Sequence, residues 1–315
     1  MTNLLIVAKQ VLILFILMGV GFACRRTKLI DDRSSKGIVN VLILFVTPCV
    51  IVDAFLRPFD ATMMKGLGIA FAVAILGHCL VIGMSYAFVR HWADGTRRVL
   101  RLATVFSNAG FMGIPLEQAI LGDRGVFFGV SYIIAFNLFI WSWGYAMMKG
   151  AADEPGVSRW KTYRTMLVNP GTVGLSAGLV CFLLPFKLPT VIGDPIHAMA
   201  GMNTPLAMIV IGYYLAGARL GPVFRMKSAY VSMAIRMVVY PLIVTAALYP
   251  FRRVLDRDMM LALVIAAAAP VAAMVSMFAA KFDRDVDASV GLVSGTTILS
   301  IVTMPPVVAF AMSIL

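Results

Sequence analysis

Stretches of about 20 apolar residues recur along the whole chain and are separated by short polar connections. At about 1.5 Å per residue, a helix of this length crosses the roughly 30 Å hydrocarbon core of a bilayer. The pattern therefore predicts an all-α polytopic membrane protein with about ten transmembrane helices. The predicted spans lie near residues 4–23, 37–56, 66–89, 99–120, 125–148, 166–185, 196–217, 229–250, 259–280 and 287–312.

The composition agrees with a bilayer as the solvent. Of the 315 residues, 61% are hydrophobic and 13% are charged, whereas about a quarter of a soluble domain is charged. The first apolar stretch begins at Leu4, with no basic segment or small-residue cleavage site around it, so we expect a retained span and not a signal peptide.

The net charge of +12 does not indicate a nucleic-acid partner. Lys and Arg form short clusters between the apolar stretches, which is the pattern that orients a membrane protein and contacts anionic lipid. The four cysteines are far apart, and neither they nor the three histidines follow a metal-ligand spacing. We therefore predict no cofactor, no metal and no nucleic acid.

The basic residues are unevenly divided between alternate connections. The odd-numbered connections hold 18 Lys and Arg residues and the even-numbered ones hold 7. This bias predicts that the odd connections are cytoplasmic and that both termini lie outside an inner or plasma membrane. The longest polar connection, near 151–165, divides the chain into halves at 1–150 and 166–315. Five spans in each half would give the halves opposite orientations.

Weak internal echoes support two inverted repeats. Thr47–Pro48 in the second span matches Thr204–Pro205 in the seventh, 157 residues later. Pro115 in the fourth span matches Pro270 in the ninth, 155 residues later. Proline removes a backbone donor and clashes with the carbonyl four residues earlier, so both the fourth and the ninth helix are predicted to be broken.

The fourth span carries the most informative segment, from Ser107 to Pro115. Gly110 and Gly113 allow the chain to leave helical geometry, and Asn108 supplies an amide that both donates and accepts. We expect a second half-helix to begin near Pro115, with an N-terminal end that favours an anion. A proline kink with glycines for helix packing is the simpler interpretation.

The ninth span has small residues around its proline, from Ala266 to Ala280. Small side chains allow two unwound segments to approach closely. If the two breaks cross, four half-helix ends converge on one point, which would suit a charged solute.

The run NAGFMGIPL at Asn108–Leu116 resembles the fourth-helix motif of the auxin efflux carrier family, which includes plant PIN carriers and bacterial malate and malonate permeases. Residues 279–307 are similar to the end of that family's ninth helix and its tenth. The resemblance implies ten helices with a crossover of the fourth and ninth. It also implies a scaffold of helices one, two, six and seven, a mobile domain of the others, and elevator-type transport of small carboxylates.

The resemblance also implies a set of substrate-binding positions. One departs from the family pattern, because Met274 stands where a polar residue, often Asn, is expected. A homodimer through the scaffold helices would suit the family. The substrate-binding positions are Asn108, Gly110, Gly113, Pro115, Pro270 and Met274.

Ionisable residues inside spans are costly to bury and are functional candidates. Glu117 could bind a proton or cation coupled to transport, or be a carboxylate stabilised at a helix N-terminus. Asp53 could be functional, although an interfacial structural role is favoured. Arg236 could add positive potential to an anion site, pair with Glu117 or Asp53, or extend toward the cytoplasm.

The leading functional hypothesis is a secondary transporter of a small organic anion, a mono- or dicarboxylate such as malate, malonate or an auxin-like acid. Two alternatives stay open. In a sodium-coupled symporter of the bile-acid type, three polar residues of the tenth span could help to bind the cation, although their hydroxyls could equally bond back to helix carbonyls; they are Ser294, Thr296 and Thr297. An intramembrane hydrolase would use Ser176, although Gly174 and Gly178 around it favour helix packing instead.

Overall fold

The computed structural model describes residues 3–89, 94–149, 170–184, 188–218 and 226–315, and these residues are all-helical apart from connections and one isolated bridge. The predicted linker at 151–165 lies outside the described residues. The α-helices are α1 (Asn3–Arg26), α2 (Asp32–Val41), α3 (Thr47–Phe55), α4 (Ala61–Phe88), α5 (Asp94–Val105), α6 (Ile114–Phe139), α7 (Tyr145–Lys149), α9 (Pro170–Leu183), α10 (Thr190–Gly201), α11 (Asn203–Gly217), α13 (Lys227–Ala234), α14 (Tyr240–Leu248), α15 (Arg257–Ala268), α16 (Met274–Lys281) and α17 (Val286–Ile314).

Four π-helical segments and one 3₁₀ turn continue these helices. They are η1 (Leu42–Val46), η2 (Ala109–Gly113), η3 (Ile140–Gly144), η4 (Ile235–Val239) and the 3₁₀ turn η5 (Tyr249–Phe251). Three of the π segments end two residues before a proline, at Pro48, Pro115 and Pro241. A π turn widens the helix by one residue, which relieves the clash between the proline ring and the preceding turn. These prolines therefore stay inside continuous helices.

Seven helical stretches among the described residues are long and apolar enough to cross a membrane, so the chain is a multi-pass membrane protein. They contain seven of the predicted spans. The other three predicted spans cover the interrupted helices α5–η2 and α15–α16 and the fourteen-residue helix α9. These helices are interrupted or short, so the total of ten membrane-spanning helices stays a prediction.

Glycines set the closest helix contacts in one part of the molecule. A Cβ at Gly21 of α1 would overlap the carbonyl of Ile209, and one at Gly212 of α11 would overlap the carbonyl of Met18. Between α3 and α9, Gly174 packs directly on the backbone of Pro48. Small residues at helix interfaces are the usual means of close packing inside a bilayer, where apolar burial adds little.

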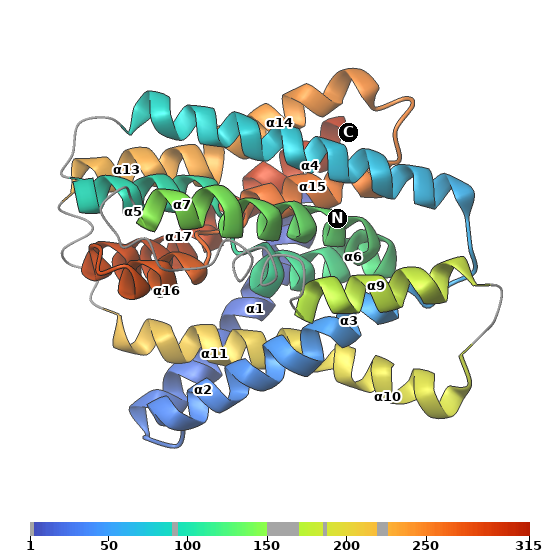
Figure 1. Ribbon diagram of the computed structural model, residues 1–315, viewed down its shortest axis with the longest axis horizontal. Helices are drawn as coiled ribbons and strands as arrows, with labels where there is room; N and C mark the ends of the chain where they lie inside the picture. The colour runs from blue at the N-terminus through green and yellow to red at the C-terminus, as the bar shows by residue number, and fades with distance from the viewer. Residues whose placement is uncertain (1–2, 90–93, 150–169, 185–187, 219–225) are drawn as a thin grey trace.

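The helices form two groups in Figure 1. The α2, α3, α10 and α11 helices run along the lower edge of the view, and α4, α13 and α14 run along the upper edge. Helix α15 lies at the centre, packed against α6, α14 and α17, and every residue from Met259 to Ala269 is buried. The outer faces carry exposed apolar side chains such as Leu76, Val191 and Val302, as expected for contact with lipid.

Candidate functional site

Two interrupted helices meet at their breaks. Helix α5 ends at Val105 and η2 begins at Ala109, while α15 ends at Ala268 and α16 begins at Met274. Between these ends, the Asn108 N–H donates to the Pro270 carbonyl over 2.6 Å, and the Ala272 N–H donates to the Phe106 carbonyl over 3.0 Å. The two non-helical segments thus pair as a short antiparallel bridge, which satisfies backbone groups that lipid could not.

A hydroxyl from α17 supports this bridge. The Val271 N–H donates to Thr296 Oγ1 over 3.1 Å, and Thr296 Oγ1 donates to the Leu292 carbonyl over 2.7 Å. Thr297, one residue further on, bonds only back to its own helix, at the Val293 carbonyl. Thr296 therefore holds the second break in place.

Arg236 joins the C-terminal ends of both interrupted helices. It is completely buried on η4, and it donates from Nη1 to the Val105 carbonyl over 2.8 Å and from Nη2 to the Ala267 carbonyl. Its guanidinium also lies 4.9 Å from the ring centre of Tyr240. Arg236 forms no ion pair with Glu117 or Asp53. Its guanidinium instead bonds to the carbonyl oxygens at the two helix C-termini, which carry a partial negative charge.

The start of the second half-helix differs from the sequence-based expectation. The helix begins at Ala109, directly after the bridge, and runs without interruption through Pro115. Gly110 and Gly113 are helical, so neither supplies the break. The prediction of a start near Pro115 was wrong because the following proline is accommodated by the π turn of η2, while pairing with the other segment holds the chain open at Phe106–Asn108.

Asn108 lies at the start of this helix. Its carbonyl accepts hydrogen bonds from the N–H groups of Met112 and Gly113, and its side chain is 7% exposed. The side-chain amide makes no hydrogen bond with the described residues. Next to it, a Cβ at Gly110 would meet nothing within 4 Å. An uncommitted amide thus lies beside open space at a helix N-terminus.

The second half-helix of the other break starts at Met274, whose side chain is partly buried. The first-turn N–H groups of a helix have no acceptor within that helix. In α16, those of Val275, Ser276 and Met277 donate to the carbonyls of Ala272 and Ala273, so the N–H of Met274 is the one left without an acceptor among the described residues. Two such N-terminal ends lie at the bridge, and the two C-terminal ends there are bonded by a cation. The electrostatic character of this point is therefore positive, which suits an anion.

Glu117 lies eight residues into the half-helix that begins at Ala109 and is 1% exposed. Its Oε2 is inaccessible and has no hydrogen-bond partner among the described residues. The carboxyl group packs on Gly129, where a Cβ would overlap it. The chain reverses between the two residues at Gly122, which has a φ of 64°.

Asp53 lies at the end of α3 and bonds to another group. Its Oδ2 is 3.1 Å from Nδ1 of His197 on α10. This contact links the second and the seventh predicted spans near their ends. Ser176 donates its hydroxyl to the Thr172 carbonyl in its own helix.

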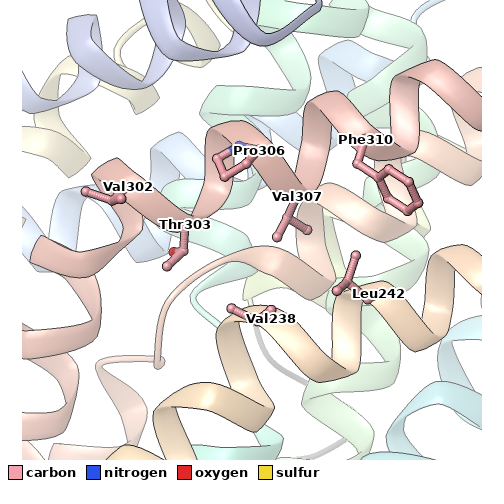
Figure 2. Close-up of a pocket in the computed structure, with 7 residues that line it drawn as sticks. All are labelled: Val238, Leu242, Val302, Thr303, Pro306, Val307 and Phe310. Atoms are coloured by element: carbon pink, nitrogen blue, oxygen red, sulfur yellow. The ribbon is translucent and has the colours of Figure 1, made fainter.

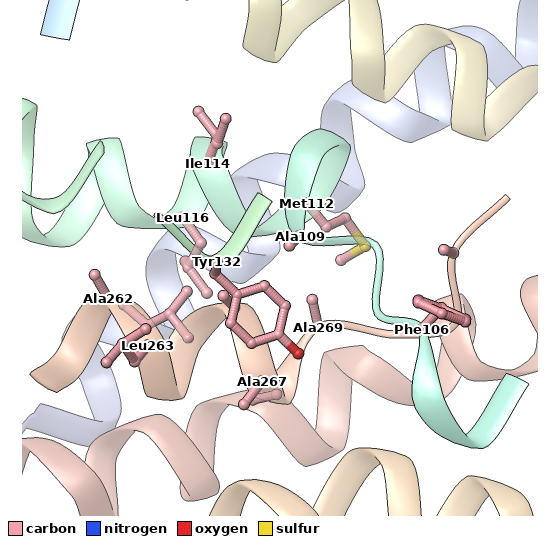
Figure 3. Packing of buried hydrophobic residues seen from close by; sticks show 14 of the residues in the cluster. Phe106, Ala109, Met112, Ile114, Leu116, Tyr132, Ala262, Leu263, Ala267 and Ala269 are labelled. Atoms are coloured by element: carbon pink, nitrogen blue, oxygen red, sulfur yellow. The ribbon is translucent and has the colours of Figure 1, made fainter. Parts of the chain in front are cut away.

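Several polar groups near the breaks have no motif in the sequence. Ser107 donates to the Tyr132 hydroxyl over 3.4 Å, and the His78 ring lies 4.8 Å from the Tyr132 ring and stacks on Phe139. Figure 3 shows Tyr132 beside Ala267 and Ala269 at the second break. A histidine inside an apolar stretch, such as His78, was the one sign in the sequence of this polar group. Its ring partners lie in other spans, so the sequence did not indicate which residues it contacts.

Further buried polar atoms without a hydrogen-bond partner among the described residues include the Asn203 amide nitrogen and the Ser276 hydroxyl. Ser276 belongs to the first turn of α16, two residues after Met274. Asn203 directly precedes Thr204–Pro205, so the internal echo pointed to its neighbourhood. Among the described residues, no three His, Cys, Asp or Glu side chains form a group that could hold a metal.

An apolar groove of about 570 Å³ lies elsewhere, between the η4–α14 helix and α17. Figure 2 shows Val238 and Leu242 on one side, facing Thr303 and Val307 on the other. Val302 and Phe310 at its rim are largely exposed, so the groove faces the lipid. It has no part in the paired breaks.

Comparison with known proteins identifies the family. A family described as membrane transport proteins matches residues 6–308. The chain belongs to the auxin efflux carrier family. An uncharacterized transporter from Methanothermobacter thermautotrophicus is 24% identical over 306 residues, covering 94% of this chain and 96% of that protein. This auxin efflux carrier family protein is therefore a membrane transporter, with a small-molecule substrate and a lipid bilayer as its surroundings.

Proposed function

We propose that this protein is a secondary transporter of a small organic anion, a mono- or dicarboxylate such as malate, malonate or an auxin-like acid, and that it works by an elevator-type mechanism. The paired helix breaks carry the proposal. Two helix N-termini begin there, Asn108 has a free amide, and Arg236 bonds the two C-terminal ends. A carboxylate is the common metabolite group that matches N–H donors and positive potential.

The substrate would contact the helix start at Asn108 and the backbone of Gly110, with Gly113 and Pro115 shaping the first turns. Pro270 and Met274 would form the opposite side. The Met274 side chain contributes no polar atom of use to an anion, so we assign recognition on that side to the Met274 N–H at the start of α16. The Ser276 hydroxyl is a further candidate donor there.

Equivalent contacts support two inverted halves at 1–150 and 166–315. Arg98 in the first turns of α5 donates to the Met147 carbonyl near the end of α7, over 2.6 Å. Arg257 at the start of α15 donates to the Met312 carbonyl near the end of α17, over 2.8 Å. In each half, the start of the interrupted helix would thus be hydrogen-bonded to the end of the last helix of the same half.

The two halves also make reciprocal contacts. After the chain reversal at Gly122, Arg124 forms ion pairs with Asp256 and Asp258 at the start of α15. Close to the other reversal, at Asp283 with a φ of 49°, Asp285 accepts a hydrogen bond from Thr96 near the start of α5. Each contact pairs the end of one interrupted helix with the start of the other, as a twofold-related crossover of the fourth and ninth helices requires.

The glycine contacts support a division into scaffold and mobile domains. They join α1 to α11 and α3 to α9, which are the first, second, sixth and seventh predicted spans. We assign these to the scaffold, with a homodimer through them, and the remaining helices to the mobile domain. The bias of Lys and Arg toward the odd connections supports an orientation with these connections in the cytoplasm and both termini outside.

Transport in proteoliposomes tests the proposal. Uptake of radiolabelled malate, malonate and indole-3-acetate should be saturable, and Asn108→Ala should raise KM by about tenfold, the equivalent of one hydrogen bond to a charged group. Asn137→Ala is a matched control, because its amide donates to the Ile133 carbonyl in its own helix.

Two results would count against the proposal. If no carboxylate is transported, the substrate class is wrong. If Asn108→Ala and Pro115→Ala both leave saturable uptake unchanged, the site is wrong. Uptake that requires sodium would favour the bile-acid-type symporter instead, so each assay is run in sodium and in potassium buffer.

A further inference from the structure

We infer that Glu117 is the proton-binding group of this transporter, and that one proton on its carboxyl group accompanies each anion across the membrane. The inference rests on the proposed function and deepens it by naming the coupling ion and the residue. It starts from the position of a buried carboxyl group without a partner.

Glu117 is not explained by the charge at a helix N-terminus. The half-helix begins at Ala109, so the first-turn N–H groups belong to Ala109–Met112, and Glu117 lies in a later turn. The favourable effect of a helix end on a carboxylate falls off within the first turn. The structure therefore removes the simpler explanation that the sequence left open.

No positive charge neutralises Glu117 either. Arg124, close by in sequence, is held by Asp256 and Asp258. The structure records no hydrogen bond or ion pair between Glu117 and any titratable group on its own helix or on the helices packed against it. Those groups are Asp123, Arg124 and Tyr132 on α6, Lys65, His78, Cys79 and Tyr86 on α4, Arg257 and Asp258 on α15, Cys49 and Asp53 on α3, Lys9, Cys24, Arg25 and Arg26 on α1, Cys181 on α9, and Tyr213 and Tyr214 on α11.

A buried carboxylate without a counter-charge or a donor is costly, and such a group takes up a proton instead. A metal cation would need several oxygen ligands around it. Here Oε2 faces the bare Cα of Gly129, and Oε1 lies near Gly113. No three His, Cys, Asp or Glu side chains among the described residues form a group that could hold a metal ion, so the surroundings fit a proton and not sodium.

The position of Glu117 connects the proton to the substrate. The same short helix carries Asn108 at its start and Glu117 two turns later. Gly113, between them, packs on the backbone of Ala266 in α15, at 3.6 Å from an ideal Cβ. When Glu117 is protonated, this helix carries the charge of the bound anion but no second negative charge from its own carboxyl group. The helix can then move with the substrate without an unpaired carboxylate.

The coupled step is a proton transfer with no other bond change. A hydronium ion on the side where the substrate binds loses a proton, so one of its O–H bonds breaks while an O–H bond forms at the Glu117 carboxylate. On the other side that bond breaks, and a water molecule takes the proton to form hydronium. Net coupling requires the empty carrier to return after this proton has been released, because a carrier that returned protonated would move no net proton across the membrane.

The test compares gradient-driven accumulation with exchange, in proteoliposomes of the full-length protein. With one proton per anion, a gradient of one pH unit drives at most about tenfold accumulation of a monocarboxylate. We expect Glu117→Gln, which imitates the neutral acid, to lose this accumulation. It should retain exchange of labelled for unlabelled carboxylate at equal pH. Gln118→Ala is the matched control, because this neighbouring side chain is exposed and bonds to Asp123.

Accumulation by Glu117→Gln at the wild-type level would overturn the inference. A wild-type protein that transports carboxylates without any response to the pH gradient would also overturn it and leave the proposed function standing. Protein-free liposomes correct for diffusion of the uncharged acids.

A second measurement covers a Glu117→Gln variant that is inactive in both assays. In infrared difference spectra of wild type against Glu117→Gln, the carbonyl band of a protonated carboxylic acid should be present at neutral pH. Absence of that band overturns the inference, whatever the transport results. If the band is present but the wild type transports no carboxylate, the proposed substrate class is wrong. The assignment of a protonated carboxyl group to Glu117 would still stand.

Discussion

Arg236 donates from Nη1 to the carbonyl oxygen of Val105 over 2.8 Å, across 131 positions of sequence. Its other terminal nitrogen reaches Ala267, so a single guanidinium bonds the C-terminal ends of both interrupted helices. Only the planar fork of arginine reaches two carbonyls in this way, since a lysine ammonium is a point charge on a flexible stem. The contact fixes the distance between the two breaks.

Arg236→Met should lower the free energy of unfolding by roughly 3 kcal/mol, because two buried carbonyls lose a charged donor. Denaturant titrations in detergent micelles would measure the change. Arg236→Lys should recover only part of it. The exposed Arg252, which bonds to the Tyr249 carbonyl, is the control position, and an equal effect of Arg252→Met would contradict the assignment.

Thr296→Val should destabilise the second break. Valine keeps the shape but leaves the Val271 N–H buried without an acceptor, at a cost of about 1–3 kcal/mol. Thr296→Ser should restore both the stability and the KM for substrate. Thr297→Val is the matched control, because the Thr297 hydroxyl bonds only to its own helix. Equal losses at the two positions, measured by thermal unfolding, would show that the hydroxyl of Thr296 does not support the break.

Gly21→Ala should force α1 and α11 apart, because the added methyl group would overlap the Ile209 carbonyl. Overpacking of this kind costs about 1–3 kcal/mol. Gly19 lies on the same helix, and a Cβ there would meet nothing within 4 Å, so Gly19→Ala should be tolerated. Comparing the Tm values of the two variants separates the effect of overpacking, which only Gly21→Ala has, from the effect of alanine on helix propensity, which both variants share.

Asp60 should make a pH-dependent contribution to stability. It precedes α4 and accepts hydrogen bonds from the N–H groups of Met63 and Thr62, which lower the pKa of its carboxyl group from the ordinary value of 3.8. A lowered pKa in the folded state adds stability that is complete above the unfolded pKa and is lost as the pH falls through the folded pKa. The Tm difference between wild type and Asp60→Asn should therefore be constant near neutral pH and shrink only below about pH 4. A difference that does not change with pH would contradict this role.

The first break shows which features the sequence pattern could predict and which it could not. Proline and glycine in 107–115 indicated a disturbed helix, and the disturbance is there. Its form differs, because the π turn of η2 accommodates Pro115, and the chain opens seven residues before this proline, where Asn108 pairs with Pro270. Proline chemistry acts locally and can be read from sequence, whereas a hydrogen bond across 162 positions cannot.

The candidate site shows the same division. Asn108, Pro270 and Glu117 were found because polar residues and prolines are rare inside apolar stretches. The partners of Arg236 were not, since they are backbone carbonyls, and every residue has one. Thr296 was considered as a cation ligand or as a hydroxyl bonded back to its own helix, and its contact with Val271 depends on which face of α17 meets the break.

The sequence by itself determined that this chain is a multi-pass helical membrane protein of the auxin efflux carrier family. Apolar runs of span length and one short motif carry that information, and the family match agrees with it. The tertiary structure alone decided where the two helices open, that Arg236 bonds both of their ends, and that Glu117 lies buried without a partner. The physical reason is that apolar length and proline act on their own segment of chain, whereas satisfying backbone groups and charges away from water depends on which distant segments meet.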